Sequence, residues 1–171
     1  MRIELRIATN GNIAQAITTA AAHFFSGSEA RAWANLGPFD ERETSFVLAY
    51  EGSEPVGTVT IRWNPNYPLF RQAGIPFIQN IEIRHDLRGQ GYGSRVMEAV
   101  EELIGRRSPQ AGICVALFDA YGPAQRLYAK RGYVPDGRGA CHRFTPLRRG
   151  EVITLGDDHL LWLVKALDRD R

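Results

Sequence analysis

A run of glycines follows a short apolar segment near the middle of the chain. The segment 77–83 is rich in apolar residues, and Gly89, Gly91 and Gly93 come shortly after it. Residues 92–105 then carry apolar side chains at helical spacing. A turn between a strand and a helix directs several free backbone N–H groups, and the positive end of the helix dipole, at one spot. The pattern therefore predicts a site that binds phosphate.

Two common phosphate-binding loops do not fit these residues. A mononucleotide loop needs a Lys and a Ser or Thr after its last Gly, and no Lys follows here. A dinucleotide loop has the spacing Gly-x-Gly-x-x-Gly and opens its fold, whereas this chain has Gly-x-Gly-x-Gly in mid-chain. Because glycine has no Cβ, the turn lets a diphosphate approach the backbone. The guanidinium of Arg88 can add two charged hydrogen bonds to the phosphate.

The pattern Arg-x-x-Gly-x-Gly, which starts at Arg88, resembles the acyl-CoA pyrophosphate loop of the GNAT N-acetyltransferase superfamily. A second motif lies about one βα unit further along the chain. Residues 121–133 resemble the superfamily's helix Asn-x-x-Ala-x-x-Leu-Tyr-x-x-x-Gly-Phe/Tyr, with Tyr121 in place of the Asn. The residues that match are Ala124, Leu127, Tyr128, Gly132 and Tyr133. The two motifs occur in the expected order and at the expected separation, which argues against a chance agreement.

The resemblance implies that acetyl-CoA is the cosubstrate and that certain residues hold it. The pantetheine arm would pair with the main chain of the preceding strand at Ile81 and Ile83, which is a form of strand addition. The pyrophosphate would meet the turn, mostly through backbone N–H groups. The turn residues concerned are Arg88, Gly89, Gln90, Gly91, Tyr92, Gly93 and Ser94. The alternative is that the glycines only form a tight turn.

The superfamily transfers an acyl group from the CoA thioester directly to an amine, without a covalent enzyme intermediate. By resemblance, Tyr128 assists the departing thiolate. A phenol of pKa ~10 is less acidic than a thiol of pKa ~8.5. A strong hydrogen bond with late proton transfer is therefore easier than early protonation. The alternative for Tyr128 is a packed core aromatic whose hydroxyl lies at the rim.

The sequence does not single out a general base. Many relatives carry a Glu six residues before the position of Ile83, and this chain has Phe77 there. Glu82 is the nearby carboxylate, but it alternates out of phase with Ile81 and Ile83. It is as well explained as a charge on the less buried face of the strand. Asp119 and a water relay are the other candidates.

Composition predicts a cytoplasmic protein with a single domain over residues 1–171. Its 44% hydrophobic and 23% charged residues are ordinary for a globular protein. A net charge of +2 is too small to indicate nucleic acid or a membrane surface as partner. No apolar run approaches the ~20 residues of a membrane span, and the first residues lack a signal-peptide core. The two cysteines and four histidines lack metal-ligand spacing, so we expect no metal.

The apolar periodicity predicts an α/β fold, with an antiparallel start and a parallel pair of strands in the middle. This agrees with the superfamily's mixed twisted β-sheet flanked by α-helices. Strands are expected at 3–8, 45–50, 55–63, 77–83, 113–118, 133–134, near 143 and at 159–164. Helices are expected at 13–24 with Asn12 as cap, at 28–36, at 92–104, and from Pro123 to Gly132.

Residues 64–76 contain three prolines and no period, which predicts a long loop. Long ordered loops beside a binding strand often carry function. Trp63, Tyr67 and Phe70 either line an acceptor site there or belong to the core, and we expect two of the three in the core.

Together these features predict an acetyl-CoA-dependent N-acyltransferase that acts on a primary amine of a small molecule or peptide. Two other interpretations stay open: a member that binds acyl-CoA as a sensor without turnover, and a nucleotide-binding module that uses the same turn. Phe77 in place of a Glu slightly favours the sensor, whereas Tyr128 favours the enzyme. The acceptor and the existence of a homodimer are left open.

Overall fold

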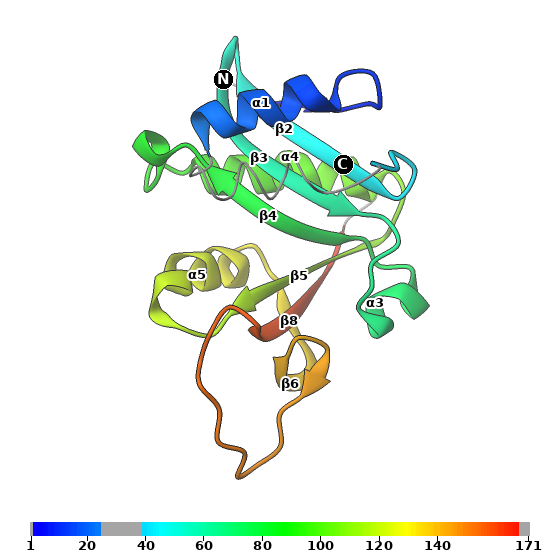
Figure 1. Cartoon of the computed structure of the whole chain (residues 1–171), viewed down its shortest axis with the longest axis vertical. Coiled ribbons are helices and arrows are strands. Elements are labelled where there is room, and N and C mark those ends of the chain that lie inside the picture. The colour runs from blue at the N-terminus through cyan, green and yellow to red at the C-terminus, as the bar shows by residue number, and fades with distance from the viewer. Residues whose placement is uncertain (1, 25–38, 168–171) are drawn as a thin grey trace.

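The computed structural model describes residues 2–24 and 39–167, and its strands form one mixed sheet (Figure 1). Within these residues the sheet has eight strands in the order β1-β2-β3-β4-β5-β8-β6-β7. Only β4 and β5 run parallel. The strands are β1 (Glu4–Ile7), β2 (Thr44–Glu51), β3 (Glu54–Arg62), β4 (Phe77–Ile83), β5 (Gln110–Ala116), β6 (Val134–His142), β7 (Thr145–Pro146) and β8 (His159–Ala166). The expected fold class is confirmed.

Helices cover both faces of this sheet (Figure 1). They are α1 (Ile13–His23), α3 (Pro68–Ala73), α4 (Tyr92–Gly105) and α5 (Gly122–Lys130), with short 3₁₀ turns η1 (His85–Leu87) and η2 (Asp119–Tyr121). Successive side chains of β2 point to opposite faces of the sheet and so belong to different cores. Phe46 and Leu48 pack with α1, whereas Val47 and Ala49 pack in the larger core that holds the buried stripe of α4.

A second core lies around the short helix α3, where the sequence predicted only a loop. That prediction was wrong because Pro68 suits a first helical turn, Phe70 is buried, and Gly74 ends the helix with φ +65°. Tyr67 and Phe70 are each 1% exposed, so two of the three aromatic residues near this segment do belong to the core. The ring of Tyr67 stacks on Trp162 at 3.9 Å between centroids.

Strands β4 and β5 are held together at one end only. They pair at Phe77 with Gly112 and at Ile78 with Ile113, and no further. The ring of Phe70 covers this end so closely that a Cβ on Gly112 would lie 2.1 Å from it.

Beyond the paired end, β4 contains a bulge. Its register with β3 shifts between Thr58 and Thr60, and Asn80 takes the left-handed conformation with φ +52°. An extra residue bends a strand, and Figure 1 shows β4 and β5 side by side at their starts and apart at their ends. We call the stretches of β4 and β5 that do not pair with each other, residues 79–83 and 114–116, the β4–β5 split.

Several expected boundaries differ from the structure. Asn12 is the N-cap residue of α1 as expected, but its side chain makes no capping hydrogen bond, because its Oδ1 accepts the N–H of Thr9 at 2.7 Å. The strand expected at 113–118 starts at residue 110 and ends at 116, where η2 soon follows. The segments expected near 133 and 143 belong mainly to one strand, β6, which is irregular between Pro135 and Ala140. The helix expected at 28–36 lies outside the described residues.

Candidate active site

The turn between β4 and α4 has the open backbone geometry that the glycine pattern predicted. Gly89 and Gly91 take φ +75° and +84°, which glycine adopts most easily. A Cβ on either residue would meet nothing within 4 Å, so this part of the turn is uncrowded. Gly91 is the N-cap of α4, and no side chain caps that end. The first N–H groups of the helix are therefore available to an anion at the positive end of its dipole.

Gly93 has a different function from its two neighbours. It lies in the first turn of α4, where a Cβ would come 3.2 Å from Cδ2 of Leu127 on α5. The residue therefore allows α4 and α5 to approach each other. Helix packing is thus one requirement for glycine at this position, and the expected contact of Gly93 with a ligand stays a prediction.

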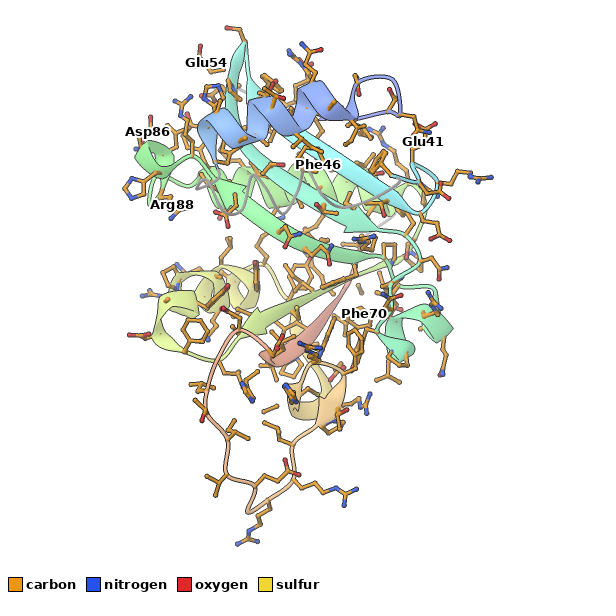
Figure 2. All side chains as sticks on the ribbon, in the orientation of Figure 1. Glu41, Phe46, Glu54, Phe70, Asp86 and Arg88 are labelled. Carbon is orange, nitrogen blue, oxygen red and sulfur yellow. The ribbon has the colours of Figure 1, made fainter. Side chains whose placement is uncertain are left out.

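Arg88 and Asp86 lie at the turn that follows β4 (Figure 2), and two side chains of this turn form hydrogen bonds with nearby residues. Arg88 donates from Nε to the carbonyl of Ile83 at 3.1 Å and from Nη2 to the carboxylate of Glu82 at 3.0 Å. Gln90 donates from Nε2 to the carbonyl of Asp86 at 2.7 Å. In this structure the guanidinium of Arg88 is thus bound to β4.

Tyr92 connects the start of α4 to the β2–β3 turn. Its hydroxyl donates to Glu51 at 2.5 Å, and Arg95 donates to the same carboxylate at 2.6 Å. These two hydrogen bonds lower the pKa of Glu51. The side chain of Tyr92 is therefore part of a structural brace, which leaves its backbone N–H for any ligand. Ser94 is exposed, and its carbonyl accepts a hydrogen bond from Arg131 at 3.0 Å.

Tyr128 is 8% exposed and lies beside the β4–β5 split. Its ring packs in the main core, 6.1 Å from the ring of Tyr133. Burial raises the pKa of Tyr128 well above its ordinary value, and the nearby Cys114 and Glu82 raise it further. The hydroxyl is therefore protonated at neutral pH and better suited to donating a hydrogen bond than to releasing its proton early. This geometry fits both the acid and the packed aromatic.

Among the candidate bases, Glu82 is the carboxylate at the split. Ile81 and Ile83 pack against the main core, and Glu82 alternates with them as expected. Phe77 is buried beside Trp162, with ring centroids 5.1 Å apart, and so occupies the dry end of β4. Asp119 is exposed, and its Oδ1 accepts the N–H of Ala120 at 2.9 Å.

The structure also brings together residues that the sequence analysis did not associate. Cys114 lies close enough to Tyr128 to influence its pKa, and burial raises the pKa of the Cys114 thiol itself to about 12. The pKa of Tyr121 is raised mainly by burial and further by the charge of Asp157, which lies in the segment before β8. Asp157 is far from Tyr121 in the sequence, so no local motif could have indicated this proximity.

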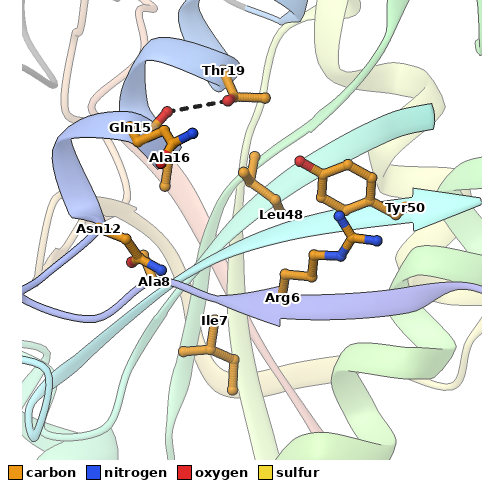
Figure 3. Close-up of a pocket in the computed structure, with 9 residues that line it drawn as sticks. All are labelled: Arg6, Ile7, Ala8, Asn12, Gln15, Ala16, Thr19, Leu48 and Tyr50. Atoms are coloured by element: carbon orange, nitrogen blue, oxygen red, sulfur yellow. Dashed lines mark hydrogen bonds between the residues drawn. The ribbon is translucent and has the colours of Figure 1, made fainter. Parts of the chain in front are cut away.

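Other parts of the surface offer less chemistry. A hollow of about 210 Å³ between α1 and strands β1 and β2 is lined by Arg6, Ile7, Ala8, Asn12, Gln15, Ala16, Thr19, Leu48 and Tyr50, which include no acid or thiol (Figure 3). Arg6 lies over the ring of Tyr50 at 3.9 Å. Over residues 2–24 and 39–167 no group of three or more His, Cys, Asp or Glu side chains could hold a metal ion. None of the helices in those ranges is long and apolar enough to cross a membrane.

Comparison with known families decides what this arrangement is. The model of the acetyltransferase (GNAT) family matches residues 13–133, which include the β4–α4 turn, the split and Tyr128. The chain belongs to the GNAT family. The resemblance stated on two short motifs is therefore confirmed. No curated protein sequence matches the chain significantly.

Solved structures share the GNAT fold along nearly the whole chain at low sequence identity. A GNAT-family protein from Desulfovibrio desulfuricans is 15% identical, with 96% of this chain and 98% of that one covered and a TM-score of 0.65. The spermidine/spermine N-acetyltransferase of Vibrio cholerae, in complex with manganese ions, is 14% identical, with 96% and 92% covered and a TM-score of 0.61. AAC(6')-Ib in complex with paromomycin and acetyl-CoA is 14% identical, with 97% and 94% covered and a TM-score of 0.66.

Proposed function

We propose that this GNAT protein is an N-acetyltransferase that moves the acetyl group of acetyl-CoA directly to a primary amine. One observation carries the proposal. The uncapped start of α4 follows Gly89 and Gly91, and it lies next to the free edge of β4, with the Tyr128 hydroxyl beside the same split. The start of α4 suits a diphosphate, the edge of β4 suits an extended amide chain, and the Tyr128 hydroxyl suits a thioester.

Binding would begin at the turn and continue along β4. Backbone N–H groups of residues 89–94 would donate hydrogen bonds to the pyrophosphate oxygens, and the main chain at Ile81 and Ile83 would pair with the pantetheine arm. The carbonyl of Ile83 already accepts a hydrogen bond from Arg88. The pantetheine arm would compete for that carbonyl, and a displaced Arg88 guanidinium would be free to turn toward the pyrophosphate.

The transfer itself needs a neutral amine and a stabilised leaving thiolate. An alkyl ammonium of pKa ~10.4 is only about 0.1% neutral at physiological pH, so a base near the acceptor is useful. Glu82 fills that role directly or through a water, and Asp119 is the alternative. The neutral amine nitrogen forms a bond to the acetyl carbon, the carbon–sulfur bond breaks, and the nitrogen releases a proton to the base as the amide forms. Tyr128 first donates a hydrogen bond to the leaving thiolate and then gives it a proton, so that CoA leaves as the thiol, and a proton from water restores the phenol.

The similar structures support an amine as acceptor without identifying it. One is a spermidine/spermine N-acetyltransferase, and another holds paromomycin together with acetyl-CoA. Both acceptor classes carry primary amines on polar, flexible or sugar-like frames. We therefore propose a small-molecule or peptide amine and no metal in the chemistry.

A second candidate is an acyl-CoA sensor without turnover. The buried Phe77 favours it, because the position where many relatives have a catalytic Glu is closed here by the aromatic core. The sensor and the enzyme make the same prediction for binding and differ in release of the CoA thiol.

The experiment combines thermal melting with a thiol-release assay over a panel of primary amines. Acetyl-CoA should raise the melting temperature, ATP should not, and at least one amine should give catalytic thiol release. A response to acetyl-CoA with no release for any amine would favour the sensor. A response to ATP alone would show that the turn serves a nucleotide-binding module.

A further inference from the structure

A buried carboxylate on α4 joins three segments of the fold. The side chains of Glu101 and Arg131 are 8% and 17% exposed, and an ionised carboxylate is costly to bury without partners. Arg131 donates to it from Nε and from Nη2, each at 2.8 Å, and Lys165 donates from Nζ at 2.6 Å. Glu101 therefore connects α4 to the end of α5 and to β8.

The guanidinium of Arg131 also reaches the first turn of α4. Its Nη1 donates to the carbonyl of Ser94 at 3.0 Å, while its other two nitrogens hold Glu101. Ser94 and Glu101 are about two turns apart on α4 and so lie on the same side of the helix. Because the donors of a guanidinium lie in one rigid plane, Arg131 fixes its own position along these two turns.

The backbone of Arg131 belongs to the last turn of α5. Arg131 is the C-cap of that helix, and its N–H donates to the carbonyl of Leu127 at 3.0 Å and to that of Tyr128 at 3.2 Å. The N–H of Tyr133 donates to the same Tyr128 carbonyl at 3.0 Å. One residue thus connects the helix start that we assign to the pyrophosphate with the turn that carries Tyr128.

The charges of this network add orientation to the packing of the two helices. Gly93 and Leu127 let α4 and α5 approach each other, but attraction between apolar groups has no preferred direction. A buried ion pair is a weak source of stability, because apolar side chains of similar volume can often replace it without loss. A bidentate arginine–carboxylate pair does require one geometry.

We propose that Arg131 is a positioning residue for the transfer, which holds the Tyr128 hydroxyl at the correct distance from the start of α4. This role rests on the proposed function, because Arg131 acts through Tyr128 and needs no contact with acetyl-CoA. An extended pantetheine arm fixes how far the sulfur lies from the pyrophosphate. A shift of α5 along α4 would therefore move the hydroxyl away from the sulfur and slow the reaction.

The test compares two substitutions that each remove one cation from Glu101. Arg131→Met removes the bonds to Ser94 and Glu101, and it leaves Lys165 as a partner of the carboxylate. Lys165→Met is the matched control, because it keeps all three hydrogen bonds of the Arg131 guanidinium. Arg131→Met should lower turnover by up to about 10²-fold, the effect of a misplacement of about 1 Å. Its dissociation constant for acetyl-CoA should change little, and Lys165→Met should change neither quantity.

A double-mutant cycle shows whether Arg131 acts through Tyr128. In the Tyr128→Phe background there is no hydroxyl to place, so adding Arg131→Met should lower turnover hardly any further. The loss in the single Arg131→Met variant should be larger for an acyl donor with a poorer leaving thiol. Effects of independent residues multiply, so equal losses in the two backgrounds would overturn the proposal.

A second measurement needs no acceptor. The ultraviolet absorbance of the thiolate, followed against pH with the desulfo-CoA complex as blank, gives the pKa of the bound CoA thiol. A hydrogen bond from Tyr128 to the thiolate lowers that pKa, so the pKa should rise in Tyr128→Phe. Arg131→Met should raise it to the same value, and Lys165→Met should leave it as in the wild type.

Together the two measurements separate this proposal from the proposed function. If no amine gives thiol release but the thiol pKa follows the expected pattern, the transferase is wrong and the positioning role of Arg131 stands. If release occurs and Arg131→Met behaves like Lys165→Met in both measurements, the transferase stands and the positioning role is overturned. An unchanged thiol pKa in Tyr128→Phe also overturns it.

Circular dichroism checks that each variant is folded. Arg131→Lys replaces Arg131→Met if the methionine variant does not fold. It keeps the positive charge, but a single ammonium cannot hold Glu101 and Ser94 in the geometry of the guanidinium. It should therefore change turnover and the thiol pKa in the same direction, and wild-type values for both would overturn the proposal.

Discussion

The two ends of the β4–β5 pair differ in almost every physical respect. At the paired end, Phe77 is buried in the aromatic cluster, Ile78 is buried in the main core, and Gly112 lies directly under the ring of Phe70. At the split, Glu82 is partly exposed and Tyr128 keeps its hydroxyl near Cys114. The buried cluster at the first end, over the described residues, contains no carboxylate and no basic side chain.

This difference shows how the fold separates stability from chemistry along one strand. Close packing fixes where β4 and β5 meet, and the bulge at Asn80 fixes where they part. Beyond the bulge, β4 still pairs with β3 but no longer pairs with β5. We expect substitutions at the paired end to change stability, and substitutions at the split to change binding or turnover.

The largest effect is expected for Tyr128→Phe. The change keeps the ring and removes one hydroxyl, so turnover should fall ~10²- to 10⁴-fold, the usual contribution of a positioned general acid. Stability should change by only about 1 kcal/mol. Steady-state kinetics with acyl donors of different leaving-thiol pKa would measure it, and the loss should be smaller for the better leaving group.

Tyr133→Phe is the matched control for that variant. Tyr133 is also buried, its ring is 6.1 Å from that of Tyr128, and burial together with the nearby Glu101 carboxylate raises the pKa of its hydroxyl. It should leave turnover nearly unchanged. If Tyr128→Phe slows good and poor leaving groups equally, the residue shapes the site and does not assist the thiolate.

The next effect belongs to the paired end. Phe77→Glu would bury a carboxylate among aromatic rings, and an unpaired buried charge costs about 3 to 5 kcal/mol. Burial should raise the pKa of the new Glu above its value in the unfolded chain. The variant should therefore regain stability as the pH falls through that raised pKa. Chemical denaturation at several pH values measures this.

Phe77→Leu provides the comparison, because it keeps the site apolar and should cost less at every pH. If Phe77→Glu instead had wild-type stability and faster turnover at low pH, the position would be open to the acceptor. The description of a dry paired end would then be wrong.

The sequence predicted the split better than the paired end, for a physical reason. The glycine turn and the Tyr128 helix depend on local backbone geometry, which residues at fixed spacing reveal. The aromatic cluster joins Tyr67, Phe77 and Trp162 from distant segments, and no local pattern encodes that contact. For the same reason α3 was missed. Its one buried residue, Phe70, is stabilised by tertiary packing rather than by a helical period.

The site shows the same limit in its details. Spacing alone made the three glycines of the turn look equivalent, yet Gly89 and Gly91 serve backbone conformation and Gly93 serves the packing of α4 on α5. The bond from Tyr92 to Glu51 joins residues 41 positions apart. This hydrogen bond depends on how the β2–β3 turn packs on α4. The sequence motif carries no information about that packing.

A third prediction concerns the turn. With acetyl-CoA at ~100 times its dissociation constant, binding should stabilise the fold by about 2.7 kcal/mol. Gly91→Val places a branched side chain where the diphosphate approaches and should remove most of that response. Gly74→Val is the control, since Gly74 also has a positive φ and open surroundings but ends α3. Melting curves with and without acetyl-CoA compare the two variants.

Both glycine variants should lose some intrinsic stability, because valine is strained in the left-handed conformation. Only Gly91→Val should lose the response to the ligand. An equal response to acetyl-CoA in both variants would show that the turn does not hold the cofactor.

The smallest effect is expected for Glu51→Gln, which weakens the brace between the start of α4 and the β2–β3 turn. Hydrogen bonds from Tyr92 and Arg95 lower the pKa of Glu51 from its ordinary 4.5. The ionised carboxylate thus stabilises the folded state above that ordinary value, and the contribution is lost as the pH falls through the lowered pKa. The melting temperatures of wild type and variant should differ at neutral pH and converge in acid.

Glu43→Gln provides the control for that comparison. Glu43 is exposed, and no hydrogen bond or ion pair joins its carboxylate to another described side chain, so its replacement should not change the melting temperature at either pH. Added salt should also reduce the difference for Glu51→Gln, because it screens partly exposed charges. If the difference between wild type and Glu51→Gln were the same at neutral and acidic pH, the brace would act through packing of the Tyr92 ring, and the charge of Glu51 would contribute nothing.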